Sequence, residues 1–387
     1  MALNRKLRYG MVGGGPGAFI GNVHRMAASL DGTMELVAGA FSSDPAKSLA
    51  QGKELALASD RCYASFSDMA EKEAAREDGI DFVSIVTPNH MHFPVAKTFL
   101  EAGFHVVCDK PMTNTLEDAE ELCNLVKKHD LVFALTHNYT GYPMVKQARA
   151  MVQEGKIGTV RKIVVEYPQG WLATPLERSG HKQADWRTDP KRAGAGALGD
   201  IGSHAENLAR YVTGLKLEEI CADITSFVEG RVIDDDANIL VHYQGGAKGV
   251  LHASQISIGE ENNLNIRVHG ETGSLQWFQE HPNWLYYREL EGPEQVFKRG
   301  NEYLSAAAQR NTRLPSGHPE AFLEAFANIY LNAGRTIAAC QAGETPNSND
   351  LDFPSVQDGA VGVHFILTAL KSGKVRKWVD ARYIPPA

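Results

Sequence analysis

Short apolar runs alternate with amphipathic helical stretches between Leu7 and His137, which is typical of βαβ units that form a mostly parallel sheet. Several runs are almost continuously hydrophobic, as expected of strands that helices cover on both faces. A capping box at residues 115–118 predicts a helix that runs to about His129. The predicted strands are residues 7–12, 35–41, 81–86, 104–108 and 131–136.

The pattern changes after Tyr142. A helix over residues 143–154 and a strand over 160–167 are followed by a long polar segment, residues 169–195, which we interpret as a lid or binding loop because idle loops of that length are rare in compact domains. A helix over 199–213 comes next, and two helices over 319–340 and 354–371 close the chain. The β-rich runs between them predict an antiparallel sheet, with strands at residues 238–243, 249–254, 263–269 and 274–278.

Composition narrows the class of protein. The 387 residues are 43% hydrophobic and 22% charged, which is ordinary globular composition, and their number predicts two domains. The formal charge of -8 disfavours nucleic acid as a partner. The apolar stretches are too short for a membrane helix, and the start of the chain lacks a signal-peptide core, so we expect a cytoplasmic protein without a membrane partner. Five scattered cysteines predict neither a disulfide framework nor a zinc site.

A glycine-rich turn follows the first predicted strand. Gly13, Gly15 and Ala18 form G-x-G-x-x-A between a strand and a helix, which is the context of a dinucleotide-binding turn. Gly13 allows the tight turn, Gly15 lets the backbone approach a pyrophosphate, and the helix N-terminus faces the phosphates. We therefore assign residues 1–142 to a doubly wound Rossmann domain. Residues 143–387 are assigned to an α+β domain with an open, mostly antiparallel sheet for substrate binding and oligomerisation.

The second predicted strand ends without the usual ribose-binding acid. Ser42 and Ser43 stand in its place, and Asp44 either reaches the ribose or caps the helix that starts at Pro45. Lys47 is the only basic residue nearby, so a clamp for the NADP phosphate is not evident. NAD is the expected cofactor, with NADP as the alternative.

Three residues carry candidate chemistry. The predicted strand 104–108 delivers Asp109 and Lys110 to the carboxyl edge of the sheet, where ligands of doubly wound folds bind. Asp200 and His204 are four residues apart and share a helix face, with Gly202 leaving a bare surface for a flat ring. Each alone has an ordinary structural explanation, such as a helix-surface hydrogen bond. Together they suit alcohol oxidation: His204 as base, Asp200 as its orienting partner and Lys110 as a stabiliser of alkoxide charge.

The motifs resemble the family of glucose-fructose oxidoreductase, inositol dehydrogenase and MocA-like proteins over nearly the whole chain. They are the glycine turn, Thr87-Pro88-Asn89 with His92, Asp109-Lys110-Pro111 where the family usually has Glu-Lys-Pro, and the segment that ends in Asp200 and His204. The resemblance implies a nicotinamide cofactor, a substrate over the open sheet of the second domain, and Lys110, Asp200 and His204 as the catalytic group. The cofactor-binding residues expected on this basis are Gly13, Gly15, Gly17, Ala18, Phe19, Ile20, Ser42, Ser43, Lys47, Thr87, Pro88, Asn89, His92, Asp109, Lys110 and Asn138.

Secondary candidates remain open. Asn89 either lies beside the nicotinamide or caps the helix from His92. The loop of residues 169–195 offers aromatic surface and hydrogen-bond donors that suit a sugar ring, including His181. His137 follows the last strand of the first domain. Residues 234–236, three aspartates, are read as a solvated turn and not a metal site. The predicted substrate-binding residues are Lys110, Tyr142, Trp171, Trp186, Arg187, Asp200, His204 and His318.

The favoured function is an NAD(P)-dependent oxidoreductase acting on a secondary alcohol of a sugar, glycoside or cyclitol. The alternative is an NAD-dependent glycoside hydrolase that oxidises a ring carbon transiently, eliminates the aglycone and returns the hydride. A metal-dependent hydrolase using Asp200, His204 and His318 would leave the glycine turn unexplained, and no metal is expected. A homodimer or homotetramer is expected, because an open sheet needs its second face covered.

Overall fold

The computed structural model describes residues 4–385 and divides the chain into two compact units. Unit 1 holds residues 4–113, Glu117–Asn138 and Leu323–Ala360, and unit 2 holds Asn114–Leu116, Tyr139–Phe322 and residues 361–385. The prediction divided the chain once, between residues 142 and 143. The units instead alternate along the chain, because the segment Leu323–Ala360 returns to pack with the N-terminal residues.

Unit 1 is built on a five-stranded sheet in the order β2-β1-β3-β4-β5, and all its pairings are parallel. This confirms the predicted Rossmann sheet, with strand ends within two residues of those expected. The strands are β1 (Leu7–Gly13), β2 (Met34–Ala40), β3 (Phe82–Val86), β4 (His105–Cys108) and β5 (Phe133–Leu135).

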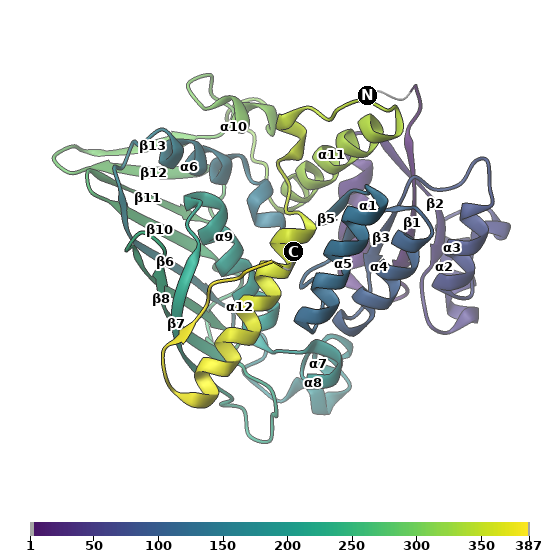
Figure 1. Cartoon of the computed structure of the whole chain (residues 1–387), viewed down its shortest axis with the longest axis horizontal. Helices are drawn as coiled ribbons and strands as arrows, with labels where there is room; N and C mark the ends of the chain where they lie inside the picture. Colours follow the sequence, from purple (N-terminus) through teal and green to yellow (C-terminus); the bar gives the residue numbers. More distant parts are fainter. Residues whose placement is uncertain (1–3, 386–387) are drawn as a thin grey trace. The chain divides into compact units, whose positions relative to one another are not determined.

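Helices cover both faces of this sheet (Figure 1). Tyr330 of α11 bonds the hydroxyl of Ser84 in β3, so α11 lies on the face to which Ser84 points. A Cβ on Gly10 of β1 would meet Met69 of α3, which places α3 on the other face. The helices are α1 (Phe19–Ser29), α2 (Pro45–Glu54), α3 (Phe66–Ala74), α4 (His92–Glu101), α5 (Leu116–His129) and α11 (Phe322–Gln341), with short turns η1 (Ser59–Arg61), η2 (Asn89–Met91) and η6 (Ser348–Leu351).

Unit 2 is built on a nine-stranded sheet in the order β13-β12-β11-β10-β6-β9-β8-β7-β14. Among the described strands of this sheet, only β6 and β9 pair in parallel, which confirms the open, mostly antiparallel sheet. The strands β7, β12, β13 and β14 were not predicted. The nine are β6 (Val160–Pro168), β7 (Leu217–Thr225), β8 (Asp236–Tyr243), β9 (Lys248–Ser254), β10 (Asn265–Gly270), β11 (Gly273–Phe278), β12 (Trp284–Glu289), β13 (Glu294–Lys298) and β14 (Val379–Asp380).

Helices α6 (Pro143–Gln153) and α9 (Ser203–Thr213) pack on one face of the large sheet (Figure 1). Strand β8 alternates accordingly, with Ile239 and Val241 buried and Leu240 half exposed on the opposite face. Helix α12 (Val356–Val375) begins in unit 1 and ends in unit 2, as does the turn η3 (Asn138–Gly141). Helix α10 (Ala306–Arg310) packs against α6.

The polar segment of residues 169–195, called here the 169–195 loop, is more ordered than predicted. It contains a 3₁₀ turn, η4 (Leu176–Ser179), and two short helices, α7 (Lys182–Arg187) and α8 (Pro190–Ala193). The helix predicted over residues 199–213 also differs, because its first part is a π-helical turn, η5 (Leu198–Gly202). The chain thus changes helical geometry between Asp200 and His204, and π turns are frequent at functional sites.

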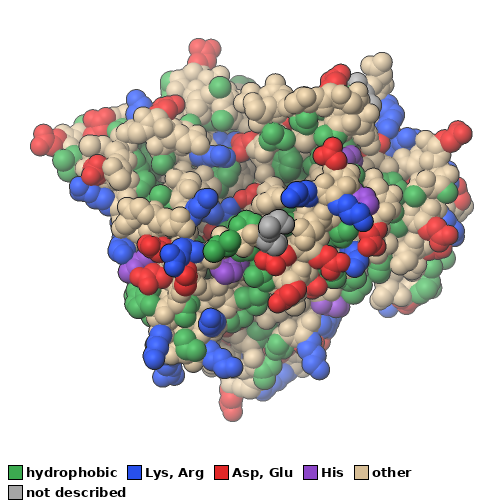
Figure 2. Space-filling view, in the orientation of Figure 1, with side chains coloured by type: hydrophobic (Ala, Val, Ile, Leu, Met, Phe, Trp, Pro, Cys, Tyr) green, Lys and Arg blue, Asp and Glu red, His purple; other side chains and the backbone are tan. Residues whose placement is uncertain are grey.

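Acidic and basic side chains are interspersed over the face drawn in Figure 2, in keeping with the modest net charge. Within residues 4–385, no helix combines the length and the apolar character needed to cross a bilayer.

Candidate active site

The glycine turn has the geometry of a dinucleotide cradle. Gly13 has φ +88°, and a Cβ there would lie 2.8 Å from the Val86 carbonyl oxygen. A Cβ on Gly15 would lie 2.6 Å from the Phe41 carbonyl oxygen, so both positions exclude any larger residue. Helix α1 begins after Ala18, whose methyl side chain cannot cap it, and its first amides are left for an anion.

Two buried polar atoms lie just beyond the strand ends of the same sheet. The hydroxyl of Thr87 follows β3, and the side-chain amide nitrogen of Asn138 follows β5. Neither atom has a hydrogen-bond partner within the part of the chain that the structure describes. Because a buried polar atom without a partner costs about 1–3 kcal/mol, these two atoms fit a site for a polar ligand. The residues present therefore fit a dinucleotide at the carboxyl edge of unit 1.

Asp44 caps α2, as one of the two sequence readings proposed. Its Oδ1 accepts hydrogen bonds from the amides of Ala46 and Lys47 at 3.0 and 3.3 Å. Its other oxygen lies 3.6 Å from the Lys47 ammonium. Ser42 is half-buried and Ser43 exposed. The Asp44 carboxylate is thus engaged by its own helix.

His92 connects the two turns that carry predicted cofactor residues. It is buried, with Nδ1 2.7 Å from the Pro111 carbonyl oxygen and Nε2 2.9 Å from that of Thr87. Burial lowers the pKa of its imidazole. The alternative in which Asn89 caps the helix from His92 is wrong, because Asn89 lies in η2 and Met91 occupies the cap position of α4 without a side-chain bond.

Lys110 follows β4 and is held by its neighbour Asp109. The Asp109 Oδ1 accepts from the Lys110 amide at 2.9 Å and from the Thr136 hydroxyl at 3.0 Å. The same oxygen lies 4.0 Å from Nε2 of His24, whose Nδ1 is 2.7 Å from the Tyr330 hydroxyl. Burial lowers the pKa of His24 to about 4, so this imidazole is neutral at pH 7. Asp109, which binds the Lys110 amide, therefore also contacts a buried polar pair in the core of unit 1, His24 and Tyr330.

In unit 2, Asp200 is oriented by donors from two distant segments. Its Oδ2 accepts from Gln255 Nε2 at 2.9 Å and from Arg187 Nε at 3.3 Å. His204 opens α9, is 6% exposed and lies edge-on to the Tyr139 ring at 4.7 Å between centroids. The expectation of a bare surface at Gly202 is wrong: it is buried, and a Cβ there would lie 3.1 Å from Leu198 and 3.4 Å from Ala253.

The rings of Tyr139 and Tyr167, which the sequence did not predict as site residues, lie 4.7 and 6.2 Å from that of His204 between centroids, and a network of hydrogen bonds extends from them. The Tyr139 and Tyr167 hydroxyls bond each other, Tyr167 donates to Asn262 Oδ1 at 2.7 Å, and Asn262 donates back to Tyr139 at 3.3 Å. Gln169 donates to the same Asn262 oxygen at 2.7 Å and accepts from Trp171 Nε1 at 3.1 Å. Burial raises the pKa of both tyrosines, which keeps the phenols neutral. Nothing in the sequence signalled these contacts, since the Tyr167–Asn262 pair spans 95 residues.

The other predicted substrate residues occupy different environments. The Arg187 guanidinium stacks on Trp186 at 4.2 Å from the ring centroid. Tyr142 is buried and stacks with Tyr139 at 6.1 Å between ring centroids, whereas His318 is exposed on the loop before α11. His181 caps α7, accepting from the Ala184 amide at 3.3 Å.

The aspartates at 234–236 correct a prediction. Asp234 and Asp235 are buried, 9% and 1% exposed, and do not form a solvated turn. Asp234 accepts from the amides of Gly196 and Leu198, each at 2.7 Å, and burial raises the pKa of its carboxyl. Across residues 4–385 there is no group of three His, Cys, Asp or Glu side chains that could hold a metal ion, and Asp200, His204 and His318 form none.

Comparison with known proteins agrees with this arrangement. Residues 7–137 match the model of an oxidoreductase family with an NAD-binding Rossmann fold, and residues 145–276 match a GFO/IDH/MocA C-terminal domain. The uncharacterized oxidoreductase YfiI of Bacillus subtilis is 34% identical over 383 residues, with 98% of each chain covered. The crystal structure of an inositol dehydrogenase homolog from Azotobacter vinelandii complexed with NAD+ has a TM-score of 0.94 and 36% identity, with 98% of both chains covered. Its complex with NADH and myo-inositol has a TM-score of 0.91 and 35% identity over the same share of both chains.

These matches confirm the resemblance on which the site was predicted, and they extend it over both units of the chain. The chain therefore belongs to the GFO/IDH/MocA family of oxidoreductases, and its residues 7–137 form an NAD-binding Rossmann domain.

Proposed function

We propose that the protein oxidises or forms a secondary alcohol on a cyclitol, sugar or glycoside with NAD as the redox partner. The proposal rests on the Asp200 carboxylate, which Gln255 and Arg187 hold by hydrogen bonds. Asp200 precedes the buried imidazole of His204 by four residues. This pair lies among hydroxyl, amide and indole groups, which suit a polyhydroxylated ring. The myo-inositol complex of the Azotobacter protein supports the same class of substrate.

The cofactor would be held by backbone groups and a few polar side chains of unit 1. The amides of the turn at Gly13–Ala18 and of the first turn of α1 suit the pyrophosphate, and Thr87 and Asn138 offer buried polar atoms at the same edge. Bound nicotinamide supplies the hydride acceptor and donor. NAD is favoured over NADP, since only Lys47 stands near the end of β2 and it already lies 3.6 Å from Asp44.

The chain's own residues supply proton transfer and electrostatics. His204 takes the hydroxyl proton as the alcohol is oxidised, since a ring nitrogen of a neutral imidazole can accept a proton. Asp200 orients the substrate and the imidazole. Lys110, at the carboxyl edge of the sheet in unit 1, is assigned the stabilisation of the negative charge that develops on the alcohol oxygen. Trp171, Trp186 and Arg187 would contact the rest of the ring, with Tyr142 and His318 as further candidates.

Purified protein incubated with NAD or NADP and a panel of inositols, sugars and aryl glycosides tests the proposal. NADH absorbance and aglycone release are followed together. Substrate-dependent NADH without aglycone supports the dehydrogenase. Aglycone release without net NADH would show the glycoside hydrolase that works by transient oxidation, and neither signal from any compound would refute the proposed substrate class.

We also propose a homodimer or homotetramer in the cytoplasm. The support is the outward face of the large sheet, where Leu240 and Trp284 are 50% and 44% exposed. Light scattering coupled to size exclusion measures the assembly, and a monomer at micromolar concentration would contradict it.

A further inference from the structure

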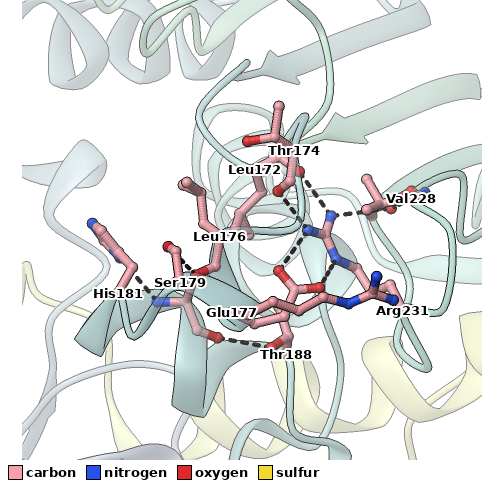
Figure 3. Close-up of polar contacts among 12 residues, drawn as sticks. Leu172, Thr174, Leu176, Glu177, Ser179, His181, Thr188, Val228 and Arg231 are labelled. Atoms are coloured by element: carbon pink, nitrogen blue, oxygen red, sulfur yellow. Dashed lines mark hydrogen bonds and ion pairs between the residues drawn. The ribbon is translucent and has the colours of Figure 1, made fainter.

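One buried arginine, in the connection between β7 and β8, binds the 169–195 loop of the same unit. The side chain of Arg231 is 1% exposed, and its Nε and Nη2 donate to the two oxygens of Glu177 at 3.1 and 3.0 Å. Two further N–H groups reach the loop backbone, with Nη1 donating to the Leu172 carbonyl at 2.8 Å and Nη2 to that of Thr174 at 3.1 Å. Figure 3 shows the guanidinium enclosed by these groups. Three points of one loop thus converge on a single side chain.

Asp235 is a second carboxylate partner of Arg231. Nη1 of Arg231 donates to Asp235 Oδ2 at 3.2 Å, and the same carboxylate accepts from the amides of Phe227 and Val228 at 2.8 and 3.1 Å. All five N–H donors of the guanidinium are therefore used. A buried guanidinium between two carboxylates keeps its geometry, because removing one partner strands a charge away from water.

The preceding residue, Asp234, holds the segment that leads to Asp200. Its two oxygens accept from the amides of Gly196 and Leu198, and the Asp200 amide in turn donates to the Gly196 carbonyl at 2.8 Å. Asp235 contributes here as well, since its carbonyl accepts from the Gln255 amide at 2.9 Å. Adjacent residues in the chain thus position both the 169–195 loop and the backbone around Asp200.

The far end of the loop returns to Asp200. Arg187 in α7 donates to the Asp200 carboxylate and stacks on Trp186. The turn η4, which carries Glu177, lies against α7, so a shift of η4 displaces these two side chains. The hydrogen bonds of Arg231 given above go to Glu177, Asp235 and the loop backbone, so the Arg231–Glu177 pair acts through the loop.

We propose that Arg231 and Glu177 are positioning residues, which hold the 169–195 loop in the conformation that binds the alcohol and so determine substrate affinity and selectivity. This inference rests on the proposed function for its kinetic consequence. The structural part of the inference, that the pair holds the loop in place within unit 2, does not depend on the proposed function.

The test compares Glu177→Ala with two matched variants. Asp185→Asn removes another ion-paired carboxylate of the same loop, exposed and 2.7 Å from Arg192, and serves as the control. Glu177→Gln keeps a hydrogen-bond acceptor for Arg231 and serves as the conservative rescue. Glu177 is chosen because replacing Arg231 strands the buried Asp235 and endangers folding. The readouts are tryptic cleavage located by mass spectrometry, the Kd for NAD, and KM and kcat for the best alcohol of the panel.

Glu177→Ala is expected to raise the rate of cleavage after Arg178, Lys182 or Arg187 by about tenfold or more, since opening of a braced loop limits proteolysis. KM should rise by a similar factor, with kcat and the Kd for NAD changed far less, and Glu177→Gln should recover most of both effects. Asp185→Asn should resemble the wild type in every readout.

Equal cleavage rates in Glu177→Ala and Asp185→Asn overturn the proposal that Arg231 and Glu177 hold the loop, whether or not any alcohol is oxidised. Faster cleavage with an unchanged KM and unchanged selectivity overturns its role in substrate binding. A wild-type protein that oxidises no compound of the panel refutes the proposed function instead. The cleavage comparison still decides whether Arg231 and Glu177 hold the loop.

Discussion

The carboxyl edge of the sheet in unit 1 and the Asp200–His204 region of unit 2 are built from different kinds of contact. In unit 1 the cradle is backbone: a turn of six residues, an uncapped helix start and two side chains at strand ends. In unit 2 the geometry comes from side chains that are distant in sequence, such as Gln255 with Asp200 over 55 residues. A backbone cradle tolerates change in most side chains but no Cβ at its glycines. A side-chain network is instead sensitive to the replacement of any of its members. This difference between the two regions can be tested.

The largest effect is expected from the chemical groups. His204→Ala and Lys110→Ala should each lower turnover by about 10²–10⁴-fold, because a positioned base or charge contributes that much. The Kd for NAD should change far less than turnover, because the glycine turn is intact in both variants. Steady-state kinetics and an NAD titration give the two values.

His281→Ala is the matched control for the two substitutions His204→Ala and Lys110→Ala, since His281 is exposed on the turn between β11 and β12. Near wild-type turnover in His204→Ala or Lys110→Ala would remove that residue from the proposed mechanism.

Acid should destabilise unit 1 before unit 2. Burial lowers the pKa of His24 and of His105 to about 4, below the unfolded value near 6.5. Between these values the unfolded chain binds more protons, so the stability present at pH 7 is lost as the pH falls from about 6.5 to 4. At pH 5 each imidazole should cost on the order of 2 kcal/mol.

Hydrogen exchange of β3 and β4 at pH 7 and pH 5 measures this loss. All five tryptophans lie in unit 2, so their fluorescence reports the other unit separately. His105→Gln, which retains an acceptor for the Val132 amide, should remove the part of the pH dependence that His105 contributes. An unchanged slope in that variant would assign the acid sensitivity to other groups.

A methyl group in the cradle should weaken cofactor binding. Gly15→Ala brings a Cβ to 2.6 Å from the Phe41 carbonyl oxygen and must displace the turn, so the Kd for NAD should rise by about tenfold or more. Gly32→Ala is the control, because Gly32 has φ +66° and open space around it. It should lose about 1 kcal/mol of stability and bind NAD normally. Equal NAD affinities in the two variants would show that the turn does not hold the cofactor.

The smallest effect is expected at Asp44. Asparagine caps helices as well as aspartate does, so Asp44→Asn should change stability by less than about 0.5 kcal/mol and leave the preference for NAD over NADP unaltered. Isothermal titration with both cofactors measures this. A large loss of NAD affinity would mean that the carboxylate binds the ribose as well as capping α2.

Much of unit 1 was predictable because its signals are local. The β1–α1 turn, the strand ends and the cap at Asp44 each depend on fewer than ten neighbouring residues, and the structure has them where the pattern placed them. Predictions that needed a packing partner did worse. Gly202 faces β9 instead of open space, and Asp234 and Asp235 are buried anchors instead of a solvated turn.

The sequence by itself determined the fold class, the dinucleotide turn and the identity of Lys110, Asp200 and His204 as candidate groups, because hydrophobic periodicity and short motifs act over a few residues. Only the tertiary structure decided that Leu323–Ala360 packs with unit 1, that Tyr139 and Tyr167 lie beside His204 and bond Asn262, and that Arg231 bonds the 169–195 loop. Those contacts join residues tens to hundreds of positions apart, and the burial that makes each hydrogen bond necessary exists only after the chain has folded.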